Sequence, residues 1–198
     1  MSVDAYSELQ QQIHFLLEID RLKCVVRQSR LADGSRRENS AEHSWHLAMF
    51  ATTLCQHAEG ETNVCRVVQL LLLHDVIEID AGDTPIHSSN RSKSELAAAE
   101  AQAARRIFGL LPTGQARQFE ALWHEFEAGE TNEARFAKAL DRLQPLLLNV
   151  AVGGGTWSEN GVREEQVIER YGPTIKAGSP SLWDAAQELV RGHFSRQT

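Results

Sequence analysis

Helical periodicity is the feature of this sequence that most limits the folds open to it. Apolar residues recur at spacings of three and four through most of the 198-residue chain, which is the pattern of amphipathic helices. Alternating β-branched segments, which mark half-buried strands, are nearly absent. The pattern predicts an all-α helical bundle.

Capping and helix-breaking residues divide this pattern into separate helices. Asn39, with Glu42 three residues later, predicts a capped helix start, and Pro145 predicts a kink. Helices are expected at roughly residues 5–26, 39–57, 63–79, 94–108, 114–127, 132–150, 163–170 and 180–192, with loops at 29–37 and 153–155. Because no long linker interrupts them, we expect one domain over residues 1–198, with a core at about 13–150 and C-terminal helices at 163–194 packed on it.

Charge and composition exclude several classes of partner. The formal net charge is −7, whereas general binders of nucleic acids or anionic membranes usually carry a basic excess. No apolar run reaches the roughly 18 residues that span a bilayer, and residues 1–11 lack the apolar stretch of a signal peptide. Three scattered cysteines without a CxxC pair indicate reduced thiols. We therefore expect a cytoplasmic protein that binds neither nucleic acid nor membrane.

Polar residues interrupt the apolar stripe of the segment at 63–79. His74, Asp75 and Glu78 occupy or adjoin the positions that would continue the stripe of Val64, Val67, Val68 and Leu71. Burying an imidazole and two carboxylates is costly unless they are paired or bind a cation. No Lys or Arg lies near them on the same face of this helix, so a bound cation is the stronger interpretation.

Two further helices carry a similar interruption. His43 shares a face with Leu47 and Phe50, and Asp141 lies among the apolar residues of the segment at 132–150. Taken singly, such residues are more often core histidines or surface ion-pair partners. Together with His74 and Asp75, however, they form a set of two imidazoles and two carboxylates. That set suits a divalent cation with open coordination positions.

Three segments carry a resemblance to a known family. They are ENSAEHSW at Glu38–Trp45, LLLHDVIEIDAGDTP at Leu71–Pro85 and KALDRLQ at Lys138–Gln144. This pattern resembles the HD-domain superfamily of metal-dependent phosphohydrolases, and within it the subfamily of bacterial 5′-deoxynucleotidases and their eukaryotic HD-domain relatives. The resemblance extends from about Ile13 to Trp183, which is most of the chain.

The resemblance implies a role for each matching residue. One divalent ion per chain (Mn²⁺, Co²⁺, Fe²⁺, Zn²⁺ or Mg²⁺) would be held by His43, His74, Asp75 and Asp141. Glu78 and Asp83 match the catalytic acids. The substrate-binding set would comprise Arg27, Gln28, His43, Asp83, Thr84, Pro85 and Ile86. Gln28 stands where the bacterial enzymes often carry Trp near the sugar, which leaves the preference between deoxyribose and ribose open.

The function that the resemblance implies is hydrolysis of (deoxy)nucleoside 5′-monophosphates to nucleoside and phosphate, by a protein that is commonly a homodimer. Two alternatives stay open: a phosphohydrolase that acts on another small phosphate ester or nucleotide, and a catalytically silent module that binds a metal or a nucleotide. An oxygen-activating iron enzyme would need a second iron and further histidine ligands, which the sequence pattern does not place.

Overall fold

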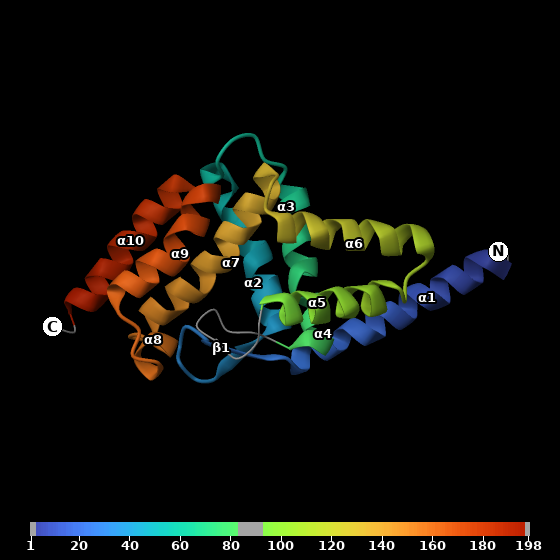
Figure 1. Ribbon diagram of the computed structural model, residues 1–198, viewed down its shortest axis with the longest axis horizontal. Helices are drawn as coiled ribbons and strands as arrows, with labels where there is room; N and C mark the ends of the chain where they lie inside the picture. Colours follow the sequence, from blue (N-terminus) through green and yellow to red (C-terminus); the bar gives the residue numbers. More distant parts are fainter. Residues whose placement is uncertain (1–2, 83–92, 197–198) are drawn as a thin grey trace.

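The computed structural model describes residues 3–82 and 93–196, and helices dominate them (Figure 1). The helices are α1 (Val3–Ile19), α2 (Ser40–Leu54), α3 (Val64–Leu73), α4 (Glu78–Ala81), α5 (Lys93–Phe108), α6 (Thr113–Ala128), α7 (Asn132–Ala151), α8 (Thr156–Glu159), α9 (Glu164–Gly178) and α10 (Pro180–Ser195). Short 3₁₀ turns lie at η1 (Asp20–Cys24), η2 (Cys55–His57) and η3 (His74–Ile77). Strands β1 (Val26–Arg30) and β2 (Arg37–Asn39) form a small antiparallel sheet. The predicted all-α class is confirmed, with this hairpin as an addition.

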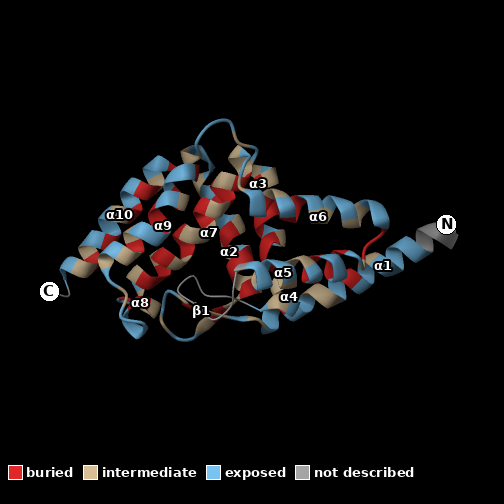
Figure 2. Ribbon diagram, in the orientation of Figure 1, coloured by how far each residue is buried: buried red, intermediate tan, exposed pale blue. Residues whose placement is uncertain are grey.

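Helix α7 lies at the centre of the bundle and contacts α2, α3, α6, α9 and α10 (Figure 1). Buried residues fall into two apolar clusters, and the buried faces of the helices are visible in Figure 2. Leu70 and Leu71 of α3 belong to the first cluster, whereas Val76 and Ile77 of η3 belong to the second. The turn between these pairs, which carries His74 and Asp75, therefore lies where the two cores meet.

Local capping chemistry sets the helix boundaries. The capping box of Asn39 and Glu42 forms as predicted, so α2 begins directly after β2. Gly129 ends α6 in the left-handed conformation, with φ of 63°, which a residue without a Cβ adopts at low cost. The Ser179 side chain accepts a hydrogen bond from the Leu182 backbone N–H, and Pro180 opens α10 as predicted.

The structure corrects the predicted first helix. It ends at Ile19, and the chain passes through η1 into β1 instead of continuing to Val26. Side chains along β1 alternate between outward and inward positions, with Arg27 and Ser29 facing inward. The inward residues are polar, so the alternation of apolar residues that would signal a strand is missing from the sequence.

Two helices continue past a residue that the sequence pattern marks as a break. Helix α7 continues through Pro145, because buried leucines on both sides hold it against its neighbours. Helix α9 continues past Arg170 to Gly178, where it packs on α7. In α9, tertiary packing thus outweighs a local signal for an end.

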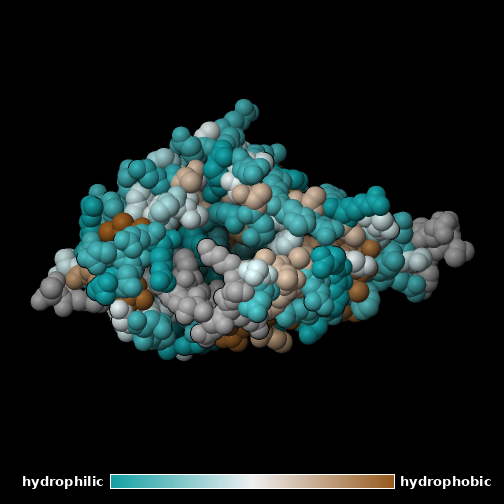
Figure 3. Space-filling model, viewed as in Figure 1, coloured by the Kyte–Doolittle hydropathy of each residue, from teal (hydrophilic) through white to brown (hydrophobic). Residues whose placement is uncertain are grey.

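One face of the molecule is mostly polar. The face drawn in Figure 3 is largely hydrophilic, with small separate hydrophobic patches. Helix α1 is an exception, because Leu9, Ile13, Leu16 and Leu17 expose between 45% and 68% of their surface. Among residues 3–82 and 93–196, no helix is both long enough and apolar enough to cross a membrane.

Candidate metal centre

A change of helix type places His74 and Asp75. Helix α3 ends at Leu73, and the next four residues form η3 before α4 begins at Glu78. The prediction of one continuous helix at 63–79 is therefore wrong. Because residues three apart eclipse each other in a 3₁₀ turn, Asp75 and Glu78 project toward the same side, and both lie near Arg27.

Four ligand-type side chains from three parts of the fold converge at this turn. His43 of α2, His74 of η3 and Asp141 of α7 each offer an atom within 4.8 Å of the others. His43 Nε2 lies 3.1 Å from Asp141 Oδ1 and 3.8 Å from Asp75 Oδ2. His74 Nε2 lies 2.9 Å from Asp75 Oδ1 and 3.7 Å from Asp141 Oδ1. The structure thus brings together the predicted metal set.

The tautomer of His74 is set by the main chain. Its Nδ1–H donates to the Leu71 carbonyl oxygen at 2.8 Å, so Nε2 is the nitrogen that faces the carboxylates and is available to a metal ion. This buried Nε2 has no hydrogen bond of acceptable geometry within the part of the chain described. A cation accepts lone pairs from imidazole and carboxylate alike, and the donor set therefore fits a divalent metal ion.

The two carboxylates of the cluster favour a positive charge close to them. Burial lowers the pKa of His74, but the carboxylates of Asp75 and Asp141 outweigh burial and raise that pKa to about 10. Burial alone would raise the pKa of Asp75, yet His74 and Arg27 hold it at about 2. Burial lowers the pKa of His43. Without a metal, His74 therefore holds the balancing proton and His43 stays neutral.

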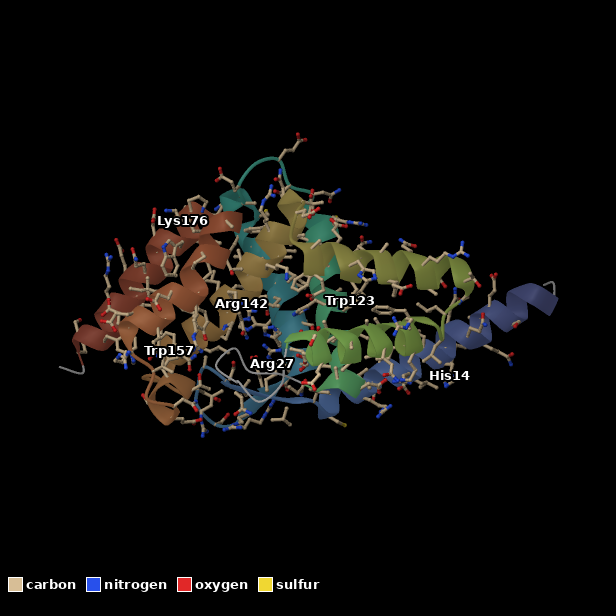
Figure 4. The ribbon with its side chains drawn as sticks, viewed as in Figure 1. His14, Arg27, Trp123, Arg142, Trp157 and Lys176 are labelled. Carbon is tan, nitrogen blue, oxygen red and sulfur yellow. The ribbon has the colours of Figure 1, made fainter. Side chains whose placement is uncertain are left out.

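Arg27 brings a guanidinium to the edge of the cluster from β1, near the middle of the molecule (Figure 4). Its Nη1 donates to Asp75 Oδ2 at 2.8 Å and lies 3.9 Å from Glu78 Oε1. Glu78 Oε2 in turn accepts a hydrogen bond of 2.7 Å from Ser40 Oγ. Beside a metal-type ligand set, the Arg27 guanidinium can bind an anionic substrate, and the Glu78 carboxylate is held in a defined position next to it.

The remaining predicted substrate residues are placed differently. Gln28 follows Arg27 on β1, so the two side chains point to opposite faces of the strand, and Gln28 is exposed. Asp83, Thr84, Pro85 and Ile86 lie outside the described residues.

Sequence reasoning missed several residues around the cluster. Glu38 and Gln144 are buried and hydrogen-bonded to each other. Both stand inside the segments that carry the family resemblance, which was their available signal. Arg142 Nη1 lies 3.7 Å from Asp141 Oδ2, and Figure 4 labels this arginine on α7. The pairing of Arg27 with Asp75 was also missed, because it joins residues 48 apart in sequence.

Comparison with known proteins places the chain among related sequences. The chain is 30% identical over 136 residues to human 5′-deoxynucleotidase HDDC2, a match covering 68% of this chain and 65% of that protein. It is 30% identical over 139 residues to a 5′-deoxynucleotidase of Enterobacter sp. strain 638, covering 67% of this chain and 69% of that one. The chain thus spans slightly less than two thirds of the human relative.

Solved structures extend the likeness to nearly the whole chain. A crystal structure described as a predicted metal-dependent phosphohydrolase from Magnetospirillum magnetotacticum is 49% identical, with a TM-score of 0.90 over 96% of this chain and 97% of that one. A conserved hypothetical protein from Pyrococcus furiosus shares the fold at 21% identity, with a TM-score of 0.60 over 90% of this chain and 99% of that one. The family model of the HD domain matches residues 19–183. The chain therefore belongs to the HD domain family.

Proposed function

We propose that this protein is a metal-dependent phosphohydrolase that converts (deoxy)nucleoside 5′-monophosphates to nucleoside and phosphate. The observation that carries the proposal is the convergence of His43, His74 and Asp141 within 4.8 Å, with Asp75 against both imidazoles. Arg27 and Glu78 lie beside this set. A cation site, a guanidinium and a carboxylate in one place are the components that phosphomonoester hydrolysis needs.

The metal part of the proposal is one divalent ion per chain, held by His43, His74, Asp75 and Asp141. Mn²⁺, Co²⁺, Fe²⁺, Zn²⁺ and Mg²⁺ are the candidates, since two imidazoles and two carboxylates suit hard and borderline cations. When bound, such an ion supplies Lewis-acid stabilisation of phosphoryl charge and lowers the pKa of a water molecule.

The protein's own groups account for orientation and proton transfer. Arg27 presents a planar guanidinium that suits two phosphoryl oxygens. Glu78, held by Ser40 at 2.7 Å, orients the attacking water and takes its proton. A bond forms between the water oxygen and phosphorus, the bond from phosphorus to the 5′ oxygen breaks, and that oxygen leaves with a proton. We assign the delivery of this proton to Asp83.

The assignment of the substrate rests on the relatives, whose names specify 5′-deoxynucleotidases. We propose that Thr84, Pro85 and Ile86 contact the nucleoside, as the family resemblance implies. Gln28, exposed on the opposite face of β1 from Arg27, leaves the choice between deoxyribose and ribose to the substrate assay.

We also propose a cytoplasmic homodimer. The exposed stripe of Leu9, Ile13, Leu16 and Leu17 along α1 supports a second copy as a partner, because contiguous exposed apolar residues favour association. The three cysteines are free and exposed, which fits a reducing compartment. Sedimentation of the purified protein tests the first part, with Leu17→Lys expected to give monomers.

The test of the function is phosphate release from the four ribonucleoside and four deoxyribonucleoside 5′-monophosphates. Metal-stripped protein would receive Mn²⁺, Co²⁺, Mg²⁺ or Zn²⁺ in turn. We expect release that requires a metal and is lost in Glu78→Gln, while the matched control Glu188→Gln, on an exposed position of α10, keeps it. Release only from non-nucleotide esters would move the assignment to another phosphate ester. A protein that binds metal but releases no phosphate from any ester would be a silent module, and the proposed hydrolase would be wrong.

A further inference from the structure

Two buried polar side chains support the cluster without belonging to its ligand set. Gln144 of α7 is fully buried, and Glu38 of β2 exposes 2% of its surface. Polar groups so deeply buried are costly unless they are hydrogen-bonded. The hydrogen bonds of Gln144 and Glu38 therefore indicate the role of these buried side chains.

Gln144 is the hub of these contacts. Its Oε1 lies 3.1 Å from His43 Nδ1, and its Nε2 donates to Glu38 Oε2 at 2.9 Å. The same Nε2 lies 3.3 Å from His46 Nδ1. Gln144 comes three residues after Asp141 on α7, so one face of this helix both contacts His43 Nε2 and supports His43 Nδ1.

The chain of contacts has one consistent direction of donation. Burial raises the pKa of Glu38 to about 7, against the lowering effect of the Gln144 hydrogen bond. In its ionised form the Glu38 carboxylate only accepts hydrogen bonds, so it holds the amide nitrogen of Gln144 on its own side. The amide oxygen must then face His43, and only an Nδ1–H can donate to it. With the proton on Nδ1, the lone pair of His43 is on Nε2, which faces Asp141 and Asp75 and is available to a bound cation. Without a cation, a proton on Nε2 could equally donate to Asp141 Oδ1 at 3.1 Å, so the contact with Gln144 selects the metal-binding tautomer.

We infer that Gln144, anchored by Glu38, is a positioning residue that fixes the tautomer and ring orientation of His43 for metal binding. The inference rests on the proposed metal site, and it assigns a role to two residues that the proposed chemistry leaves unused. His74 needs no such partner, because its Nδ1–H is held by the backbone carbonyl of Leu71. The Nδ1–H acceptor of His43 is a side chain, which a substitution can remove, whereas that of His74 is a backbone carbonyl.

The first test replaces the amide. Gln144→Met keeps the length of the side chain and removes its polar group, and Gln118→Met on an exposed position of α6 is the matched control. Calorimetric titration of metal-stripped protein with Co²⁺ or Mn²⁺ should show affinity about 10- to 100-fold weaker in Gln144→Met, as for other groups that orient metal ligands. The control should bind as the wild type does.

A second variant separates positioning from folding. The double exchange Glu38→Gln with Gln144→Glu moves the carboxylate next to His43 and the amide to position 38, so acceptance from Nδ1–H is retained. We expect metal affinity within a few-fold of wild type in this pair, whereas Glu38→Gln alone frees the amide of Gln144 to turn over and weakens binding. Thermal melts of each metal-free variant establish that it is folded.

The tautomer itself gives a readout independent of activity. Long-range ¹H–¹⁵N spectra of protein loaded with diamagnetic Zn²⁺ should show the His43 proton on Nδ1 and the metal on Nε2 in wild type and in the double exchange, and a mixture of states in Gln144→Met. Unchanged metal affinity and an unchanged tautomer in folded Gln144→Met would overturn the inference. Wild-type protein that binds metal but releases no phosphate would refute the proposed function alone and leave this inference standing.

Discussion

Metal binding should displace the proton that His74 carries in the metal-free protein. The carboxylates of Asp75 and Asp141 raise the pKa of His74 to about 10 against the effect of burial, so at about pH 7.5 this imidazole is almost fully protonated. A metal ion requires the neutral ring. Removing the proton at that pH costs about 3.5 kcal/mol, at about 1.4 kcal/mol for each pH unit below the pKa.

The expected result is release of about one proton per metal ion, and an apparent affinity that rises about tenfold per pH unit from pH ~6.5 to ~8.5. Calorimetric titrations of metal-stripped protein in two buffers of different ionisation enthalpy measure both quantities. His124→Ala, at an exposed position of α6, is the control and should behave as wild type. Affinity that is constant over this range, with no proton released, would refute the electrostatic reasoning.

Three further predictions follow from single contacts. Glu78→Gln keeps a side-chain oxygen that can accept the hydrogen bond from Ser40 Oγ, so metal affinity should stay within a few-fold of wild type. Because the amide cannot take a proton, kcat should fall by about 10²- to 10⁴-fold. A kcat near wild type would show that Glu78 does not transfer the proton. Arg27→Lys replaces a planar donor with a point charge, and KM for the phosphate ester should rise about 10-fold or more, measured in steady-state assays against an unchanged fold by circular dichroism. Gly178→Ala would bring a Cβ to within 2.3 Å of a backbone oxygen of α7, so it should lower stability by about 1–3 kcal/mol and Tm by several degrees. Gly114→Ala, whose Cβ would meet nothing within 4 Å, is its control, and equal Tm values for the two variants would contradict the packing argument.

The fold class and the candidate ligand set could be predicted from the sequence because both produce a signal in the helical period. An imidazole such as His43 or a carboxylate such as Asp141 in an apolar stripe signals a buried polar site, whatever the tertiary arrangement. The capping box at Asn39 is a local motif and formed as predicted. These features depend on residues within about one or two helical turns of each other.

Features that depend on distant contacts could not be read in the same way. The switch to 3₁₀ geometry at His74 has no breaker residue to announce it, and the turn links two apolar clusters that only the folded chain defines. Arg27 meets Asp75 because a polar hairpin delivers it there. Gln144 reads as an ordinary polar helix residue until its neighbours Glu38 and His43 are placed around it.

The most direct test of the account is a stoichiometric titration of activity with metal. Metal-stripped protein would receive Mn²⁺ in small steps, and bound metal and phosphate release from a deoxynucleoside 5′-monophosphate would be measured at each step. We predict that phosphate release rises in proportion to bound metal, saturates at one ion per chain, and is absent throughout in Asp141→Ala. Phosphate release that is independent of bound metal, or that survives in Asp141→Ala, would contradict the claim that this cluster is the catalytic metal centre.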